Sequence, residues 1–551
     1  MRKVLGLLTA LVVLFSLAGF NHPAEAATLQ KDLVVLFTSD VHCGVDQGFT
    51  YVGLKAIKDA LSADNHILLV DNGDSIQGEP LGLMTGGLAS IELMNAVGYD
   101  IAIPRNHEFD YGADRFIELS KAAQFPYICC NLFKEDQLVF APYTLKEFDG
   151  VKIGFVGADT PETIISSTPR YFQDQDGNYI YSFLQGDSAA FYAAVQQAVD
   201  DARAEGADYV VLLAHLGNSD ASRPYTYADV IEHTTGIDAL LDGHSHDTDK
   251  VVMKNKAGKA VVRQACGTKL ACVGWLRISA ANGGVDTGLY AWNNSDPVPE
   301  VLGLENEMSA ILDEKTAGIN DQLSGVIGRA TVDLTISDPE AKDETGRLVR
   351  IVHRAETNLG DFCTDAVRAI AGADVALMDG GAIRVSIPRG PVTIGDILTV
   401  WPFGNTLMMC EATGQQILDS LEWGVKGLPE ESGAFLQVSG LTYEIDTSVE
   451  SGCTRDENGL FTGVEGEYRV KNVMVGGEPL DPDKLYRVAG SSYVIADQEN
   501  GNTALDGAKR LWESDKLDYE MLVDYIQNEC GGEIGAGYEN PYGEGCIVSV
   551  E

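Results

Sequence analysis

The sequence predicts an N-terminal α/β domain followed by an α+β domain. Over residues 32–279, short apolar runs alternate with amphipathic stretches, which is typical of strands that alternate with helices. Residues 293–299, rich in Asn and Pro, interrupt this pattern, and a second set of runs begins near residue 326. The chain of 551 residues is also longer than one ordinary core accommodates.

The first part contains buried runs that predict strands and apolar stripes that predict helices. The predicted strands lie at residues 34–37, 67–70, 101–103, 151–156, 209–213, 237–241 and 260–265. The predicted helices lie at residues 51–63, 89–97 and 188–204. Residues 275–289 alternate polar and apolar side chains, so we expect one antiparallel strand that completes this domain, which we place at residues 27–298.

The second part begins after an acidic segment, residues 301–323, that predicts a helix. We interpret residues 299–325 as a connecting helix, although this helix would also fit as part of either domain. The C-terminal domain is expected over residues 326–551, with helices at 358–371 and 414–423 and strands at 375–378, 407–411 and 486–489.

The N-terminus has the pattern of a signal peptide over residues 1–26. Arg2 and Lys3 precede an apolar core at residues 5–20, and a small-x-small cleavage sequence ends at Ala26. A membrane anchor is the alternative, but the apolar run is short for a span and small residues follow it. We therefore expect cleavage, secretion or periplasmic localisation, and no stable membrane anchor. The formal charge of −43 argues against binding to a nucleic-acid polymer, which requires a basic surface.

Ten cysteines in an exported chain leave the disulfide pattern open. Cys129 and Cys130 lie in an apolar run and are predicted to be buried thiols. Cys266 with Cys272, or Cys530 with Cys546, are possible pairs. Cys43 directly follows a candidate ligand, His42, but an ordinary loop residue is the simpler interpretation.

Five apolar runs are followed by side chains that bind cations. The residues concerned are Asp40, His42, Asp74, Asn106, His215, His244 and His246. A single His after a strand is more often structural, but five such endings at the carboxyl ends of buried strands predict one convergent site. Mixed oxygen and nitrogen donors suit Zn²⁺ or Mn²⁺ rather than Ca²⁺. Two such ions roughly 3.5–4 Å apart would clamp a phosphoryl group, so we predict a two-metal phosphoester hydrolase.

These motifs resemble those of the calcineurin-like metallophosphoesterase superfamily. The wording of residues 72–78 and 106–112 is more narrowly similar to the exported 5′-nucleotidase family, which includes UDP-sugar hydrolases and 2′,3′-cyclic-nucleotide phosphodiesterases. The resemblance covers nearly all the mature chain. It implies a four-layer α/β/β/α metallophosphoesterase domain and an α+β substrate-binding domain of the 5′-nucleotidase type.

The resemblance also implies roles for individual residues. One metal would take Asp40, His42, Asp74 and His246, and the other would take Asp74, Asn106, His215 and His244. His107 would stabilise the transition state, and Asp110 would orient it. The family usually has Gly before Asn-His-Glu, where this chain has Arg105. Arg105 would be strained if that backbone needs a positive φ; it could also add positive charge, but we expect that the loop simply tolerates it.

Two C-terminal segments, residues 379–384 and 402–405, resemble the family's nucleotide-binding motifs. Arg384 would grip phosphate, Phe403 and Tyr493 would stack on the base, and Asn405 would bind the base edge. Ordinary packing is the alternative for the two aromatic side chains. Asp379 replaces the usual Asn. The remaining candidate substrate contacts are Arg350 and Arg354.

The expected function is therefore 5′-nucleotidase activity with two divalent metal ions and a small nucleotide as substrate. A 2′,3′-cyclic-nucleotide 2′-phosphodiesterase with 3′-nucleotidase activity, or a UDP-sugar hydrolase, is the alternative within the enzymes. An extracellular nucleotide-binding protein without catalysis is the alternative outside them. Intact ligands together with His107 and Asp110 argue against this last class, because binding alone needs neither residue.

Overall fold

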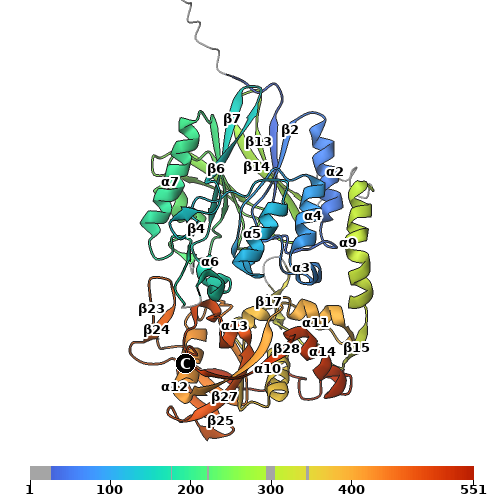
Figure 1. Ribbon diagram of the computed structural model, residues 1–551, viewed down its shortest axis with the longest axis vertical. Helices are drawn as coiled ribbons and strands as arrows, with labels where there is room; N and C mark the ends of the chain where they lie inside the picture. Colours follow the sequence, from blue (N-terminus) through green and yellow to red (C-terminus); the bar gives the residue numbers. More distant parts are fainter. Residues whose placement is uncertain (1–26, 175–176, 220–221, 293–304, 343–345, 551) are drawn as a thin grey trace, which may run out of the picture.

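The computed structural model describes residues 27–174, 177–219, 222–292, 305–342 and 346–550. It contains an upper and a lower domain joined along one side by α9 (Glu307–Leu323) (Figure 1). The predicted signal peptide, the break at residues 293–299 and the first residues of the predicted connecting helix lie outside the described residues. Within the described ranges, no helix is both long enough and apolar enough to cross a membrane.

The N-terminal domain contains two sheets that stack face to face. The order of the first is β14-β13-β1-β2-β3, and the order of the second is β11-β12-β10-β9-β7-β6. The first sheet consists of β1 (Leu33–Thr38), β2 (His66–Asp71), β3 (Ile101–Ala102), β13 (Cys272–Ile278) and β14 (Val285–Ala291). The second consists of β6 (Tyr143–Phe148), β7 (Val151–Asp159), β9 (Tyr209–His215), β10 (Ala239–Asp242), β11 (Lys250–Lys254) and β12 (Ala260–Ala265).

Burial on both faces explains the continuous apolar runs of the central strands. Along β1, Val35 and Phe37 pack into the core between the sheets, whereas Leu36 packs against the outer helices. The helices outside the first sheet are α2 (Thr50–Ser62), α4 (Leu88–Val97) and α5 (Ala113–Ala122). Those outside the second are α7 (Ser188–Ala204) and α8 (Tyr227–His233). The domain thus has the expected α/β/β/α layers (Figure 1).

One strand prediction was wrong. Residues 275–289 form two antiparallel strands, β13 and β14, rather than one. The turn between them contains Asn282 and Gly283, and Gly283 has a φ of +67° that favours glycine. The alternation of side chains continues into both strands, so periodicity alone did not reveal the reversal.

The C-terminal domain is built on a mixed sheet of order β21-β18-β27-β20-β28. Its strands are β18 (Val375–Asp379), β20 (Thr406–Thr413), β21 (Leu436–Ser439), β27 (Leu485–Ser491) and β28 (Lys509–Leu517), and its main helices are α10 (Asn358–Ala371), α12 (Gly414–Gly424) and α14 (Asp518–Asn528). Successive residues of β18 pack into two different hydrophobic cores, one on each face of the sheet. Leu377 packs into one core and Met378 into the other. The strand therefore ends at Asp379 with both faces covered.

Candidate metal centre and substrate cleft

The candidate ligands gather where parallel strands of both sheets end. Asp40 and His42 follow β1, Asp74 follows β2, and His215 ends β9. His244 and His246 follow β10, and Asn106 begins the short helix η1 (Asn106–Phe109) after β3. Since the two sheets stack with these ends together, side chains from five strands reach one place.

The first cluster consists of Asp40, His42 and His246, whose candidate donor atoms all lie within 4.8 Å of one another. The Nε2 atoms of His42 and His246 are 3.2 Å apart. Oδ1 of Asp40 is 3.4 Å from Nε2 of His246. Three donors at this spacing can surround one cation.

The second cluster consists of Asp74, His215 and His244, whose candidate donor atoms also lie within 4.8 Å of one another. Nε2 of His215 lies 2.9 Å from Oδ2 of Asp74 and 3.6 Å from Oδ1 of Asp40. The second distance shows that the two clusters adjoin. Oδ1 of Asn106 is buried and has no hydrogen-bond partner among the described residues, as expected for an atom reserved for a ligand.

Backbone carbonyls set the tautomer of two histidines. Nδ1 of His42 donates to the carbonyl oxygen of Gln77 at 3.0 Å, and Nδ1 of His215 donates to that of Asn72 at 3.2 Å. Because a carbonyl can only accept, Nδ1 carries the proton and Nε2 presents a lone pair to the clusters. This outer hydrogen bond is typical of histidines that ligate metals.

Burial also favours the neutral imidazoles of His42 and His244, which are therefore able to ligate. It lowers the pKa of His42 to about 3 and lowers the pKa of His244. For Asp74, burial alone would raise the pKa, but nearby positive groups, first that of His107, outweigh it and the pKa is lowered. The donor set therefore combines neutral imidazoles with an ionised carboxylate, which fits divalent Zn²⁺ or Mn²⁺.

The backbone of the ligands is strained. Asp40, His42, Asp74, His244 and His246 have φ between 49° and 80°, the left-handed region that L-residues avoid. Such a conformation costs about 1–3 kcal/mol per residue and persists only where surrounding contacts hold it. Its concentration in the predicted ligands marks this place as the functional centre.

Two neighbouring residues hold the ligand loops. The carboxylate of Glu108 accepts hydrogen bonds from the backbone N–H of Asp74 at 2.9 Å and of Ser75 at 2.8 Å. Gly243 lies so close to the ligands that a Cβ there would be 1.9 Å from Oγ of Ser39 and 2.8 Å from Oδ2 of Asp40. Glu108 thus orients the segment of Asp74, and the absence of a side chain at Gly243 leaves room for the carboxylate of Asp40.

His107 and Asp110 form a pair beside the clusters. Nδ1 of His107 is 2.6 Å from Oδ2 of Asp110, whose Oδ1 accepts a hydrogen bond from Oγ of Ser167 at 3.0 Å. Burial by itself would lower the pKa of His107, but Asp110 and then Asp74 outweigh it, so the pKa is raised. The pair therefore favours an imidazolium that can donate a proton or a hydrogen bond.

A cavity of about 200 Å³ lies between the two domains and reaches this pair. The N-terminal domain contributes Asn106, His107, Asp110 and residues 166–168. The C-terminal domain contributes His353, Asp379, Gly381, Ala382, Arg384, Phe403, Asn405, Gly433, Tyr493 and Asn500. The cavity thus reaches the candidate metal centre at Asn106, and the C-terminal motifs contribute to its other walls.

Five of the predicted substrate residues line this cavity: Asp379, Arg384, Phe403, Asn405 and Tyr493. Cζ of Arg384 is 5.8 Å from the ring centroid of Phe403, and that ring is 6.2 Å from the ring of His107. Burial raises the pKa of Asp379 to about 7. Tyr493 donates from Oη to the carbonyl of Ser167 at 3.4 Å, so it also touches the other domain.

The other two predicted substrate contacts, Arg350 and Arg354, lie outside the cavity lining. Neither is among the described residues that line the cavity, and Arg350 is paired with Glu431 at 2.6 Å. His353 lines the cavity instead, and its side chain is buried. Burial lowers the pKa of His353 well below the ordinary value, and the charges of Arg350 and Arg384 lower it further. Sequence reasoning missed His353 because no motif fixes the register of this loop. It missed Ser167 and Asn500 for the same reason.

The loop tolerates Arg105 without backbone strain, as expected. The φ of −149° and ψ of 175° of this residue are extended, so the position tolerates a side chain. Cys43 is buried, with its Sγ 3.4 Å from the carbonyl of Ser75, as expected for a structural residue. Cys129 and Cys130 are buried, and all ten cysteines are unbonded in the structure, including both candidate pairs.

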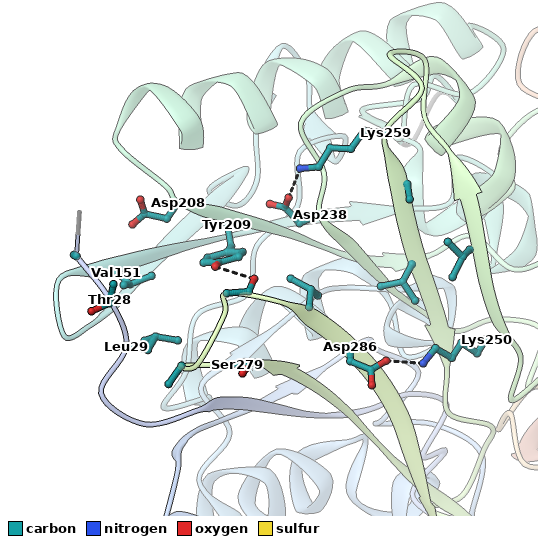
Figure 2. A pocket seen from close by; sticks show the side chains of 17 residues that line it. Thr28, Leu29, Val151, Asp208, Tyr209, Asp238, Lys250, Lys259, Ser279 and Asp286 are labelled. Atoms are coloured by element: carbon teal, nitrogen blue, oxygen red, sulfur yellow. Dashed lines mark hydrogen bonds and ion pairs between the residues drawn. The ribbon is translucent and has the colours of Figure 1, made fainter. Parts of the chain in front are cut away.

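A larger cavity, about 830 Å³, lies at the opposite end of the sheets, where β9 and β12 begin (Figure 2). Four of its charged side chains form ion pairs, Lys259 with Asp238 at 2.6 Å and Lys250 with Asp286 at 2.7 Å. It contains neither of the two candidate metal clusters, so its size does not make it the reactive site.

Comparison with known proteins agrees with this geometry. The calcineurin-like phosphoesterase family matches residues 33–248, and the 5′-nucleotidase C-terminal domain family matches residues 326–507. The trifunctional nucleotide phosphoesterase YfkN of Bacillus subtilis is 27% identical over 90% of this chain, which spans 34% of that protein's length. A 5′-nucleotidase of Vibrio parahaemolyticus is 26% identical, with 96% of this chain and 95% of that protein covered.

A solved structure shares the whole architecture. The 5′-nucleotidase precursor of Thermus thermophilus superimposes with a TM-score of 0.74 at 28% identity, covering 94% of this chain and 99% of that one. Both family matches, the two-domain likeness and the clusters at the strand ends lead to the same assignment. The chain belongs to the calcineurin-like phosphoesterases that carry a 5′-nucleotidase C-terminal domain, and it is a metal-dependent phosphoester hydrolase.

Proposed function

We propose that the protein is an exported 5′-nucleotidase that releases phosphate from nucleoside 5′-monophosphates. One observation supports this most directly: the cavity walled by Phe403 and Tyr493 also reaches Asn106 and His107 at the candidate metal centre. A base stacked on the aromatic side chains would therefore leave its phosphate near the metals. Matches to relatives named 5′-nucleotidase agree with this substrate class.

Two divalent cations, Zn²⁺ or Mn²⁺, would be held by the seven ligands at the strand ends. One ion would take Asp40, His42, Asp74 and His246, and the other Asp74, Asn106, His215 and His244. When bound, such a pair supplies Lewis-acid activation of the phosphoryl group and of the attacking water. Asp74 would serve both ions; its Oδ2 lies 2.9 Å from Nε2 of His215, and its Oδ1 accepts a hydrogen bond from the backbone N–H of His107 at 3.1 Å.

The chain's own residues do the remaining work. His107, held by Asp110, donates to the phosphoryl oxygens as negative charge develops on them. Arg384 adds a fixed positive charge from the other domain, where its guanidinium can grip phosphate. Phe403 and Tyr493 place the base by stacking, and Asn405 reads its edge. Closure of the two domains excludes bulk water from this site.

A screen of phosphate release tests the assignment. Protein stripped with a chelator and reconstituted with Mn²⁺ or Zn²⁺ is assayed with AMP, 3′-AMP, 2′,3′-cyclic AMP and UDP-glucose. We expect metal-dependent release that is fastest from AMP. Fastest turnover of 2′,3′-cyclic AMP and 3′-AMP would favour the cyclic phosphodiesterase. Cleavage confined to UDP-glucose would favour a UDP-sugar hydrolase.

Replacement of one histidine tests the mechanism. His107→Ala should retain both metals and lose most turnover of AMP. His66→Ala is a matched control, because Nε2 of His66 pairs with Asp149 at 2.7 Å, outside the described cavity lining. Equal turnover in His107→Ala and the unaltered protein would remove His107 from the reaction. Nucleotide binding without phosphate release from any substrate would instead identify a binding protein.

Export remains a proposal that rests on the pattern of residues 1–26. Cell fractionation of the full-length chain tests it directly. We expect activity in the periplasm or medium and a mature N-terminus at Ala27, read by mass spectrometry. Activity retained in the cytoplasm with residues 1–26 intact would contradict it.

A further inference from the structure

Arg105 occupies an unusual position directly behind the candidate metal centre. Its side chain is fully buried, with 0% exposure, and is among the largest buried side chains of the described residues. Nη1 donates to the carbonyl oxygen of Ala158 at 3.3 Å. Nε and Nη2 have no hydrogen-bond partner among the described residues. A guanidinium with five N–H donors is thus left with one long hydrogen bond.

A buried charge with so few contacts is costly unless opposite charges stabilise it. Burial lowers the pKa of Arg105, and nearby carboxylates oppose this effect; the carboxylates, in decreasing order of effect, are Asp159, Asp74, Asp242 and Glu108. Asp242 already pairs with Arg263 at 2.8 Å. For Asp159, Asp74 and Glu108, no ion pair with Lys or Arg occurs in the described ranges. Arg105 is therefore a permanent cation that acts on the ionised Asp74, to which Arg384 of the other domain also adds positive charge. Burial raises the pKa of Asp159 to about 8 and raises that of Glu108 as well, so these two groups favour their neutral forms.

The chain makes room for this guanidinium. A Cβ at Gly73 would lie 1.8 Å from Cγ of Arg105 and 2.8 Å from its Nε, so any other residue at 73 would displace the side chain. Gly73 immediately precedes Asp74, the ligand proposed to join both metals. The Arg105 backbone is extended and leads directly into Asn106, another proposed ligand. Arg105 is thus in contact with the segment that carries Asp74 and directly precedes Asn106, so it adjoins two segments that carry proposed ligands.

We propose that Arg105 is a positioning residue that acts as an internal counter-ion of the metal centre. Its charge stabilises the Asp74 carboxylate while the centre is free of metal, and it repels the cations that bind there. The two effects are one coupling free energy, because a group that stabilises the metal-free state more than the loaded state must weaken metal binding by the same amount. The inference rests on the proposed two-metal centre, and it concerns metal affinity rather than substrate.

The test measures metal affinity and stability in three forms of the full mature chain: the unaltered protein, Arg105→Met and Arg105→Lys. Met keeps much of the buried stem without charge, and Lys keeps the charge. Each is titrated with Zn²⁺ and with Mn²⁺ against a chromophoric chelator, and its thermal unfolding is followed with and without metal. We expect Arg105→Met to bind metal roughly tenfold more tightly or better. Its melting temperature should fall more without metal than with it. Arg105→Lys should resemble the unaltered protein in both measurements.

The outcomes separate charge from packing. Weaker or unchanged metal binding in Arg105→Met would overturn the proposal, as would an equal loss of melting temperature with and without metal. Equal effects of Met and Lys would assign the role to packing. If metal-free Arg105→Met does not stay folded, the loaded variant is titrated with chelator, and release at the same or lower chelator concentration than the unaltered protein overturns the proposal. Failure of the unaltered protein to bind either metal would defeat the metal centre itself.

Discussion

Replacement of Asp110 by Asn isolates the charge that supports His107. The variant keeps the size and shape of the side chain but removes the negative charge 2.6 Å from Nδ1 of His107. The amide oxygen can still accept from the imidazole, so the ring keeps its position. The side chains of His107 and Asp110 are 16% and 8% exposed, so water replaces little of the lost interaction.

The size of the effect follows from this contact. A hydrogen bond to a charged group contributes about 1.5–3 kcal/mol, and each 1.36 kcal/mol changes a rate tenfold. If Asp110 stabilises the transition state through the His107 imidazolium, kcat for AMP should fall roughly 10- to 150-fold in Asp110→Asn. KM should change much less, because the proposed base contacts lie in the other domain.

Steady-state kinetics with AMP, together with elemental analysis of each preparation, check this expectation. Ser167→Ala is the matched control, since it removes the 3.0 Å hydrogen bond to the same carboxylate but leaves the negative charge beside His107. Because His107 keeps its charged partner, we expect a smaller loss of kcat than in Asp110→Asn. Asp110→Asn with full metal content and kcat within about twofold of the unaltered protein would refute the assigned role of the pair.

Two further predictions concern the metal loops and the C-terminal domain. Gly243→Ala would place a Cβ 1.9 Å from Oγ of Ser39, so elemental analysis should find that metal is lost; full metal content would contradict the packing argument. Burial, followed by the charge of Glu356, raises the pKa of Asp361 to about 8, so the folded state holds a proton that the unfolded state releases near pH 4. Stability should therefore fall by about 1.4 kcal/mol per pH unit as pH rises through that window, and urea unfolding should show a smaller fall in Asp361→Asn. Equal slopes in both proteins would count against this protonation.

Much of the centre follows from local sequence. A buried parallel strand reads as a continuous apolar run, and its carboxyl end meets the ends of its neighbours, so the side chains after each run converge. That reasoning predicts Asp40, Asp74 and His215 as ligands, and in the structure Nε2 of His215 lies 3.6 Å from Oδ1 of Asp40 and 2.9 Å from Oδ2 of Asp74. The layers of the first domain followed from the same runs. The domain boundaries at residues 298 and 326 remain predictions.

Other features depend on contacts between distant segments. The left-handed backbone of Asp40, His42 and Asp74 is held by neighbouring loops, and no residue type in the sequence signals it. The turn at Gly283 was missed because alternating side chains flank it on both sides. The loop that places His353 in the cleft, instead of Arg350 or Arg354, has a register that only packing sets.

The sequence by itself determined the family, the ligand types and the strand ends that carry them, because these depend on periodicity and short motifs. Only the tertiary structure decided which side chains share the cleft between the domains and how charge is balanced behind the candidate metal centre. Arg105 shows the difference most clearly. In the sequence it is a departure from a motif, whereas in the fold it is a buried cation that faces Asp159, Asp74 and Glu108. The burial that makes this charge important is a property of the assembled core, not of the segment.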